Sequence, residues 1–288
     1  MKYIDLHVHS NISDGTFTPT EVVDEAVRSG LSAIALTDHD TVLGLQEARQ
    51  AAAKHAANGY EIEIIPGVEI SSAYNGKDLH ILGLFIDDTN ETLIKTLEAA
   101  VNEREERNIK MIHNLNNAGI PITLEALRES EPDAVITRAH FAKYLTENGF
   151  TKTRNEAFDK YLGADGPYYV PRQFITPEDA IALILQAGGI PVLAHPLLYH
   201  LSADELSELV KKLKEFGLAG IEAIYTSHTG CDESDVRRLA RLNDLLLSGG
   251  SDFHGDNKPN IVIGKGRGNL KIPYELLEAM KEYKNSAK

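Results

Sequence analysis

Short apolar runs recur along most of the chain, and their pattern predicts strands. In residues 3–9 apolar and polar side chains alternate, as they do on a strand whose two faces meet different surroundings. The other runs are short and mostly apolar, which favours buried strands. We expect strands near residues 3–9, 32–37, 62–71, 79–86, 190–195, 219–225 and 245–250.

Stretches with helical spacing separate most of these strands. One begins at Thr18 and Pro19, residues typical of a helix start, and ends at Gly30, which is typical of a helix end. Strands that alternate with helices predict an α/β fold with a largely parallel sheet. The expected helices span residues 18–30, 43–57, 202–216 and 232–243.

This alternation stops between about residues 88 and 175. Residues 90–117 read as one long helix, with an apolar face that includes Leu97 and Leu115. Shorter helices are expected near 123–130, 137–148 and 153–162. The charged run 103–107 is interpreted as a solvent-exposed face. The segment therefore predicts a helical insertion, placed as a lid over the strand ends.

Histidines and acids stand at the ends of several expected strands. His7 and His9 are two residues apart on a strand, so they face the same side and can bind one ion together. This pair alone is also compatible with an ordinary strand face. A second strand runs directly into Asp38, His39 and Asp40. Asp40 can equally cap the next helix, whereas His39 has no such structural explanation.

The same arrangement recurs further along the chain. Glu69 is a charge among apolar residues, and no Lys or Arg lies within five positions to form a buried ion pair. His80 lies near the start of the next strand, and His195 ends another. Asp252 and His254 follow the last. Each could be coincidental, but together they predict a metal centre.

Taken in order, these motifs resemble the PHP family (polymerase and histidinol phosphatase) over residues 1 to about 90 and about 175 to 275. The resemblance implies a distorted barrel of seven β/α units, interrupted by the insertion. The expected division is residues 1–88, a helical subdomain at 89–175, and 176–288. It also implies two to three divalent ions, manganese first and iron or zinc as alternatives. The implied ligands are His7, His9, Asp14, His39, Glu69, His80, His195, Asp252 and His254.

The resemblance further implies how the ligands are shared. One ion would be bound by His7, His9, Glu69 and Asp252. A second would be bound by Glu69, His80 and His195, and a third by Asp14, His39 and His254. Glu69 would bridge two ions, which would activate a water for attack on phosphorus. Asp14 and His254 are both candidates to assist the leaving group, and the sequence does not choose between them.

Composition limits the possible substrates. The 288 residues carry a formal net charge of −14, which argues against broad binding to duplex DNA or an anionic membrane. The single cysteine, Cys231, excludes an intrachain disulfide. With no long apolar run and no signal peptide pattern, we expect a cytoplasmic protein. The oligomeric state stays open.

Candidate phosphate-binding residues lie in the insertion. Arg138 and His140 stand at a helix start, and Arg172 lies in an extended stretch. His228 is a weaker candidate near a strand end. Composition alone would make the arginines ordinary surface residues. One PHP branch that resembles this chain has arginines at these places that bind substrate phosphate.

That branch contains nucleoside 3′,5′-bisphosphate phosphatases and enzymes that trim short 5′-phosphorylated RNA. We therefore expect a metal-dependent phosphatase acting on such a nucleotide. One alternative is a histidinol-phosphate phosphatase, although that branch typically lacks this style of insertion. The other is a non-catalytic PHP binding module, against which the complete ligand set argues.

Overall fold

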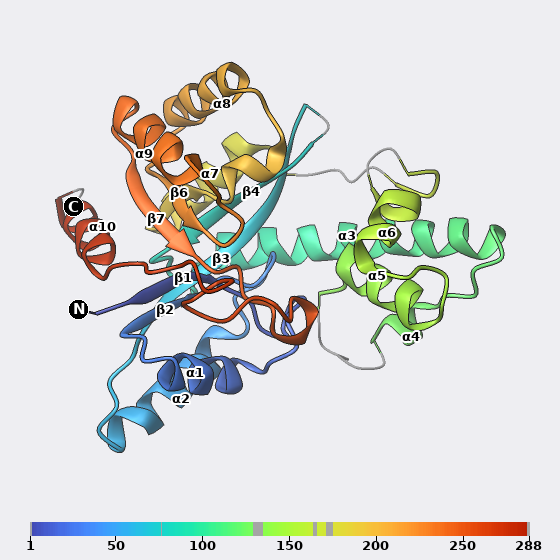
Figure 1. Ribbon diagram of the computed structural model, residues 1–288, viewed down its shortest axis with the longest axis horizontal. Helices are drawn as coiled ribbons and strands as arrows, with labels where there is room; N and C mark the ends of the chain where they lie inside the picture. Colours follow the sequence, from blue (N-terminus) through green and yellow to red (C-terminus); the bar gives the residue numbers. More distant parts are fainter. Residues whose placement is uncertain (1, 76, 129–134, 164–165, 171–174, 287–288) are drawn as a thin grey trace.

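A computed structural model describes residues 2–75, 77–128, 135–163, 166–170 and 175–286. Seven strands form one sheet in chain order (Figure 1). The expected strands are all present, with bounds that differ by a few residues. They are β1 (Ile4–Val8), β2 (Ala33–Leu36), β3 (Glu63–Tyr74), β4 (Lys77–Leu84), β5 (Ile190–Leu193), β6 (Gly220–Tyr225) and β7 (Leu246–Gly250).

The sheet curls into a nearly closed barrel, as expected for a PHP-type fold. Past the ends of β1 and β7, the Asp252 N–H donates to the His7 carbonyl at 2.9 Å, and the His9 N–H donates to the Phe253 carbonyl at 2.9 Å. The two edges approach closely because β7 ends in glycine: a Cβ on Gly250 would overlap the Cβ of His7.

One strand departs from the expected parallel sheet. β4 is antiparallel to both β3 and β5, whereas the other neighbouring pairs are parallel. β3 ends at Tyr74 and β4 begins at Lys77, so the connection is a tight hairpin. Parallel neighbours need a long crossover, and the sequence has no helix there.

Six helices cover the barrel. Four of them lie where helices were expected, whereas α7 (Pro177–Gln186) and α10 (Glu275–Ser286) were not predicted from the sequence. The first, α1 (Pro19–Arg28), begins with a capping box between Thr18 and Glu21. One apolar cluster lies between the strands and α1, α2, α7, α8 and α9, and another lies on the opposite strand face with α10. The helices are α1 (Pro19–Arg28), α2 (Leu45–Ala57), α7 (Pro177–Gln186), α8 (Ala203–Glu215), α9 (Asp232–Leu242) and α10 (Glu275–Ser286).

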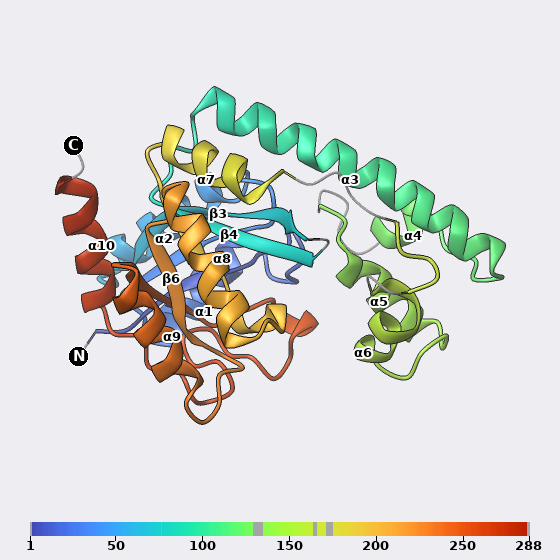
Figure 2. The same cartoon turned by 90° about the horizontal axis from the view of Figure 1, so that it is seen from above.

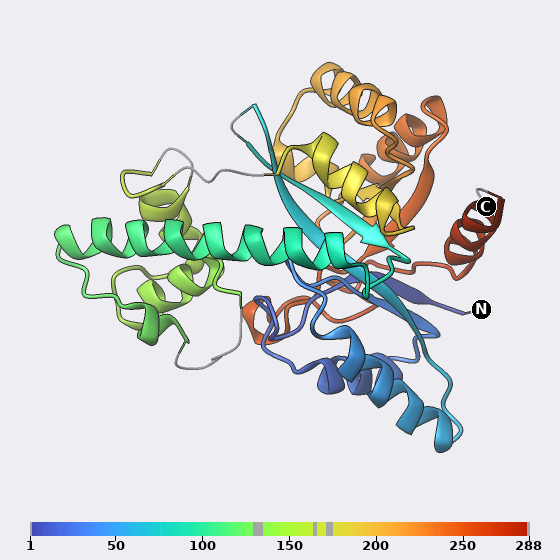
Figure 3. The ribbon, with the colours of Figure 1, turned by 180° about the vertical axis from the view of Figure 1, so that it is seen from behind.

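The segment between β4 and α7 is helical wherever the structure describes it, apart from turns and one bridge at Ile175. The long helix α3 (Glu91–Asn117) leaves the barrel, and the shorter helices gather along its far half (Figures 2 and 3). They have a third apolar cluster of their own. These helices are α4 (Leu124–Arg128), α5 (Arg138–Glu147) and α6 (Arg154–Ala157), followed by a π-helical turn, η1 (Phe158–Leu162).

The interpretation of residues 103–107 as a solvent-exposed face is wrong for two of them. Arg104 is 8% exposed and Arg107 is 6% exposed, whereas Ile109 is 52% exposed. The buried stripe of α3 runs from Leu93 to Leu115 at helical spacing, and the two arginines continue it. They occupy the middle of the stripe because that part of α3 spans the space between the barrel core and the insertion core.

No helix in the described part of the chain is long and apolar enough to cross a membrane.

Candidate metal centre

The structure brings all nine expected ligands together at one end of the barrel. They come from β1, β3 and β4 and from the segments that follow β1, β2, β5 and β7. Eight of them are less than 10% exposed, and His80 is partly buried. Strands that lie far apart in sequence therefore deliver imidazoles and carboxylates to one buried site.

Glu69 lies at the middle of this set. Its Oε2 lies 3.3 Å from His7 Nε2, and 3.2 Å from both His9 Nε2 and His39 Nδ1. Its Oε1 lies 2.9 Å from His80 Nδ1 and 3.0 Å from His195 Nε2. One carboxylate thus presents separate oxygens to two sets of imidazoles, which is the arrangement required of a bridging ligand.

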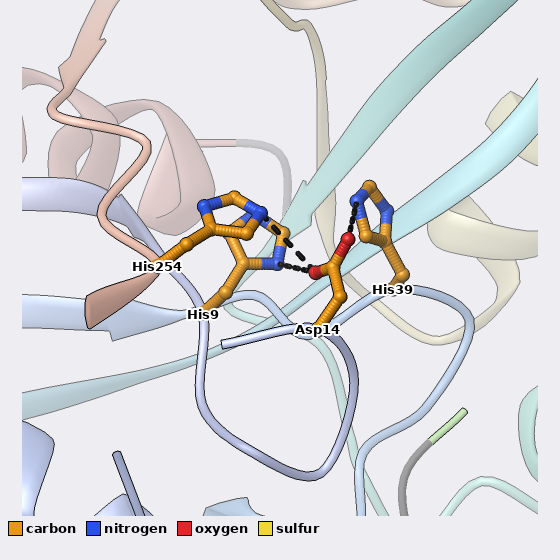
Figure 4. A group of neighbouring side chains, drawn as sticks. All are labelled: His9, Asp14, His39 and His254. Atoms are coloured by element: carbon orange, nitrogen blue, oxygen red, sulfur yellow. Dashed lines mark ion pairs between the residues drawn. The ribbon is translucent and has the colours of Figure 1, made fainter. Parts of the chain in front are cut away.

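A second group surrounds Asp14 (Figure 4). The ligand atoms of His9, Asp14, His39 and His254 all lie within 4.8 Å of one another. Asp14 Oδ1 is 3.2 Å from His254 Nε2 and 3.8 Å from His9 Nδ1, and Asp14 Oδ2 is 3.8 Å from His39 Nε2. This group adds His9 to the three residues expected for the third ion.

Asp252 lies near the first pair of histidines. Its Oδ1 is 3.7 Å from His7 Nε2 and 3.6 Å from His9 Nε2. Its Oδ2 accepts hydrogen bonds from the Tyr225 hydroxyl and the Lys258 ammonium, both at 2.6 Å. One oxygen of Asp252 is therefore held by neighbouring side chains, while the other faces the candidate ligands.

Burial and the neighbouring carboxylates act in opposite directions on the ligand histidines: against the effect of burial, Glu69 and Glu222 raise the pKa of His7, and Glu69 raises the pKa of His80. Burial and the neighbouring His254 lower the pKa of His9 to about 3, and burial lowers the pKa of His39 to about 4. Although burial opposes it, nearby histidines hold the pKa of Asp14 and of Glu69 well below the usual range. Neutral imidazoles and ionised carboxylates are the metal-binding forms of both residue types.

These residues fit divalent ions. Among the described residues, three candidate ligand atoms are buried without a hydrogen bond: His9 Nδ1, Asp14 Oδ1 and His39 Nδ1. Each such atom costs about 1–3 kcal/mol if nothing binds it. Imidazole and carboxylate donors suit manganese, iron and zinc.

Glu222 supports the site and was missed in the sequence. This fully buried residue lies on β6. Its Oε1 lies 3.1 Å from His7 Nδ1, and its Oε2 accepts from the His195 backbone N–H at 2.7 Å. A carboxylate on the second ring nitrogen fixes the orientation of a ligand histidine. The available signal was a lone charge in the apolar run 220–225.

Asp38 has a structural role. Its carboxylate accepts hydrogen bonds from Ser10 N at 2.8 Å, Ser10 Oγ at 2.7 Å and Ser13 Oγ at 2.6 Å. It therefore fixes the loop that carries Asp14.

Strained backbone surrounds the site. Asp40, His195 and Asp252 have positive φ values of 55°, 26° and 57°. Such conformations cost about 1–3 kcal/mol in non-glycine residues and persist only where the surroundings enforce them. All three residues are ligands or directly follow one.

A cavity of about 380 Å³ opens above the ligands. The barrel contributes Asp14, His39, Glu69, His80, His195, Asp252 and His254 to its wall. The insertion contributes Arg104, Arg107, Arg138, Arg154 and Phe158, and the loop after β7 contributes Asn257 and Lys258. Basic side chains thus share the cavity lining with the candidate metal ligands, in a chain whose net charge is −14.

The expected substrate-binding residues lie in different places. Arg138 lines the cavity and forms an ion pair with Asp78. His140 is buried beside the cap of α5, where its Nδ1 accepts from Thr137 N at 3.0 Å, and it is not among the residues that line the cavity. His228 Nδ1 lies 2.9 Å from the Ala223 carbonyl, also outside the lining. Arg172 lies outside the described residues.

Comparisons with known proteins identify the family of the chain. The PHP domain model matches residues 5–169. A 5′-3′ exoribonuclease from Haemophilus influenzae is 37% identical over 253 residues, which cover 88% of this chain and 90% of that protein. A 3′,5′-nucleoside bisphosphate phosphatase from Chromobacterium violaceum is 37% identical over 265 residues, which cover 92% of this chain and 91% of that protein.

One solved structure has a similar fold. It is that of a protein from Bifidobacterium adolescentis, which is described as a metal-dependent phosphoesterase and is 28% identical to this chain. It matches with a TM-score of 0.84 over 97% of this chain and 95% of its own. Since the PHP model covers more than half of the sequence and full-length relatives exceed 30% identity, the chain belongs to the PHP domain family.

Proposed function

We propose that this phosphoester hydrolase removes the 3′-phosphate from nucleoside 3′,5′-bisphosphates and also trims short 5′-phosphorylated RNA. The observation that carries the proposal is the cavity, whose lining contains both the candidate metal ligands of the barrel and Arg107 and Arg138 of the insertion. The names of the two relatives from Chromobacterium violaceum and Haemophilus influenzae support these substrates.

We assign two to three divalent ions to the nine ligands, with manganese as the first candidate and iron or zinc as alternatives. When bound, such ions lower the pKa of water and neutralise charge on the phosphoryl oxygens. Glu69 holds the two imidazole sets together through its separate oxygens. Asp14 and His254 lie 3.2 Å apart at the cavity wall and are the two candidates to assist the departing alcohol. Because Asp14 is held ionised, it would act as a hydrogen-bond acceptor and not as the proton source.

The surroundings of Arg107 are the reason to expect a second anionic group on the substrate. Among the described residues, no carboxylate lies within ion-pair distance of its guanidinium; its Nε donates to the Val170 carbonyl at 2.8 Å. Burial and the charges of Arg138 and Arg104 lower the pKa of Arg107 to about 10. A buried cation without a counter-ion is costly, and a substrate phosphate would relieve that cost.

Arg138, together with Arg172, is the second candidate to bind this anion. The Arg138 guanidinium forms an ion pair with Asp78, and its Cζ lies 5.8 Å from the ring centroid of Phe158 and 5.6 Å from that of Tyr169. The phosphate that is cleaved lies at the metal-binding residues. A phosphate at Arg107 and Arg138 is therefore a different group on the same substrate.

The test is an activity screen of the purified, manganese-loaded protein that measures released phosphate for the monoesters and released mononucleotides for the RNA. It compares a nucleoside 3′,5′-bisphosphate, 5′-phosphorylated RNA of a few nucleotides, and histidinol phosphate. The proposal predicts the highest kcat/KM for the bisphosphate and release of mononucleotides from the RNA. Preference for histidinol phosphate would replace it with that alternative, and no turnover of any substrate would favour a binding module.

A further inference from the structure

Arg104 joins the insertion to the metal centre. It projects from α3 and donates from Nη2 to the Asp40 carboxylate and, at 2.8 Å, to Ser71 Oγ. The side chains of Arg104 and Asp40 are 9% and 0% exposed, so solvent does not screen this ion pair as it does a surface pair. The contact joins α3 to two barrel segments that carry candidate metal ligands, one with His39 and one with Glu69.

Asp40 connects those two ligands. It directly follows His39, and its N–H donates to the Glu69 carbonyl at 3.0 Å. Its Oδ1 accepts from Ser71 N at 2.8 Å, two residues beyond Glu69. The backbone and side chain of Asp40 thus hold β3 at Glu69 and two residues beyond it, in a conformation with a φ of 55°.

The insertion contacts the ligand set at a second point. Thr137, the N-cap of α5, donates from Oγ1 to Asp14 Oδ2 at 3.1 Å. Residues of the insertion therefore contact one ligand directly and flank two others. A segment that only covered the substrate would not need these bonds.

We propose that Arg104 is a positioning residue for the metal ions: by holding Asp40 and Ser71 it fixes His39 and Glu69, which makes the insertion part of the metal centre. The proposal rests on the proposed metal site but not on the identity of the substrate. Groups that orient metal ligands typically contribute about 10- to 100-fold to metal affinity.

Arg104 also lines the cavity, so a role in binding phosphate is the competing explanation. Arg107 offers the contrast, because it lies on the same helix stripe and lines the same cavity. Among the described residues, however, its guanidinium forms no hydrogen bond or ion pair with a ligand-bearing segment of the barrel. A phosphate-binding arginine changes KM for the substrate. A positioning arginine changes the affinity for metal in the absence of substrate.

The experiment is a calorimetric Mn²⁺ titration of the chelated full-length protein. Arg104→Met should weaken Mn²⁺ affinity by about tenfold or more. Its lost activity should return as Mn²⁺ is raised, with KM for substrate little changed. Lys95→Met is the matched control, because Lys95 lies on α3 and pairs with Glu91 at 73% exposure. Arg107→Met should leave Mn²⁺ affinity within about twofold and raise KM.

Rescue and folding controls complete the test. Arg104→Lys should recover part of the affinity, because an ammonium can still pair with Asp40. If Arg104→Met does not fold, judged by circular dichroism, Asp40→Asn is titrated under the same criteria. Mn²⁺ affinity within twofold of the wild type, or a KM rise that Mn²⁺ does not reverse, would overturn the inference. A wild-type protein that binds no Mn²⁺ would instead refute the metal site itself.

Discussion

At the scale of single residues, Glu69 has the most demanding role. It faces five imidazoles through two oxygens, so neutralising it removes charge from both sets of ligands. Glu69→Gln should therefore be the most damaging single ligand substitution. Metal analysis after gentle purification should show loss of at least one ion per chain. Full metal content together with wild-type kcat would contradict the bridging role.

The two cavity arginines make a second prediction. Losing a charge-assisted bond to the second phosphate costs about 1.5–3 kcal/mol, or roughly one to two powers of ten. Arg107→Ala and Arg138→Ala should lower kcat/KM for a nucleoside 3′,5′-bisphosphate by that order and affect an aryl phosphate much less. Steady-state kinetics on both substrates measure this. Equal losses would mean that the arginines contact the cleaved phosphate or support the fold.

Residue types and spacing pointed to histidines and acids at the strand ends, and the resemblance to the PHP family supplied the set of nine. The structure brings these nine side chains together, and their role as metal ligands stays a prediction. The same reading placed Arg104 and Arg107 in solvent. Their charged neighbours in the run 103–107 concealed that both continue the buried stripe of α3. Whether an arginine on such a stripe is buried depends on a cavity formed by distant segments, which local sequence does not reveal.

At the scale of elements, the junction of β1 with the end of β7 supports the site. The Asp5 carboxylate accepts from the backbone N–H groups of Ser251 at 2.9 Å and Gly264 at 2.7 Å. Asp5→Ala leaves both donors buried and unpaired, so the free energy of unfolding should fall by about 2–3 kcal/mol. Urea denaturation measures it.

Asp24→Ala is the control for this prediction. Asp24 pairs with His55 at 44% exposure, so its loss should change the unfolding free energy by less than about 0.5 kcal/mol. Equal effects of the two substitutions would show that Asp5 does not hold the strand ends together.

Periodicity predicted the strands and helices well, but it did not predict the direction of β4. The missing helix between β3 and β4 was visible in the sequence and requires a hairpin. The insertion helices have a separate apolar cluster, which supports an independent subdomain. Its boundaries at residues 88 and 175 stay a prediction.

At the scale of the whole molecule, we expect ions bound at the candidate metal centre to stabilise the fold. We predict at least two divalent ions per chain, since the buried ligands form several overlapping groups. Exhaustive chelation should abolish activity, and added Mn²⁺ should restore it and raise the melting temperature, because ions bind only the folded state. Less than one equivalent of metal in a protein still active after chelation would refute the site.

Charge is distributed unevenly over the molecule. The chain is acidic overall, yet basic side chains line the cavity together with the candidate metal ligands. That separation favours small anions that reach the cavity over extended polyanions that would cover the surface. This charge distribution is one reason to expect a substrate that is a nucleotide with two phosphates.

The most direct test of the account compares kcat/KM for a nucleoside 3′,5′-bisphosphate with that for the matching nucleoside 3′-monophosphate, in saturating Mn²⁺. The two substrates present the same bond to the metal centre and differ only in the second phosphate. The account predicts a preference for the bisphosphate of roughly one to two powers of ten, as expected for one charge-assisted contact. Comparable values for the two substrates would contradict it.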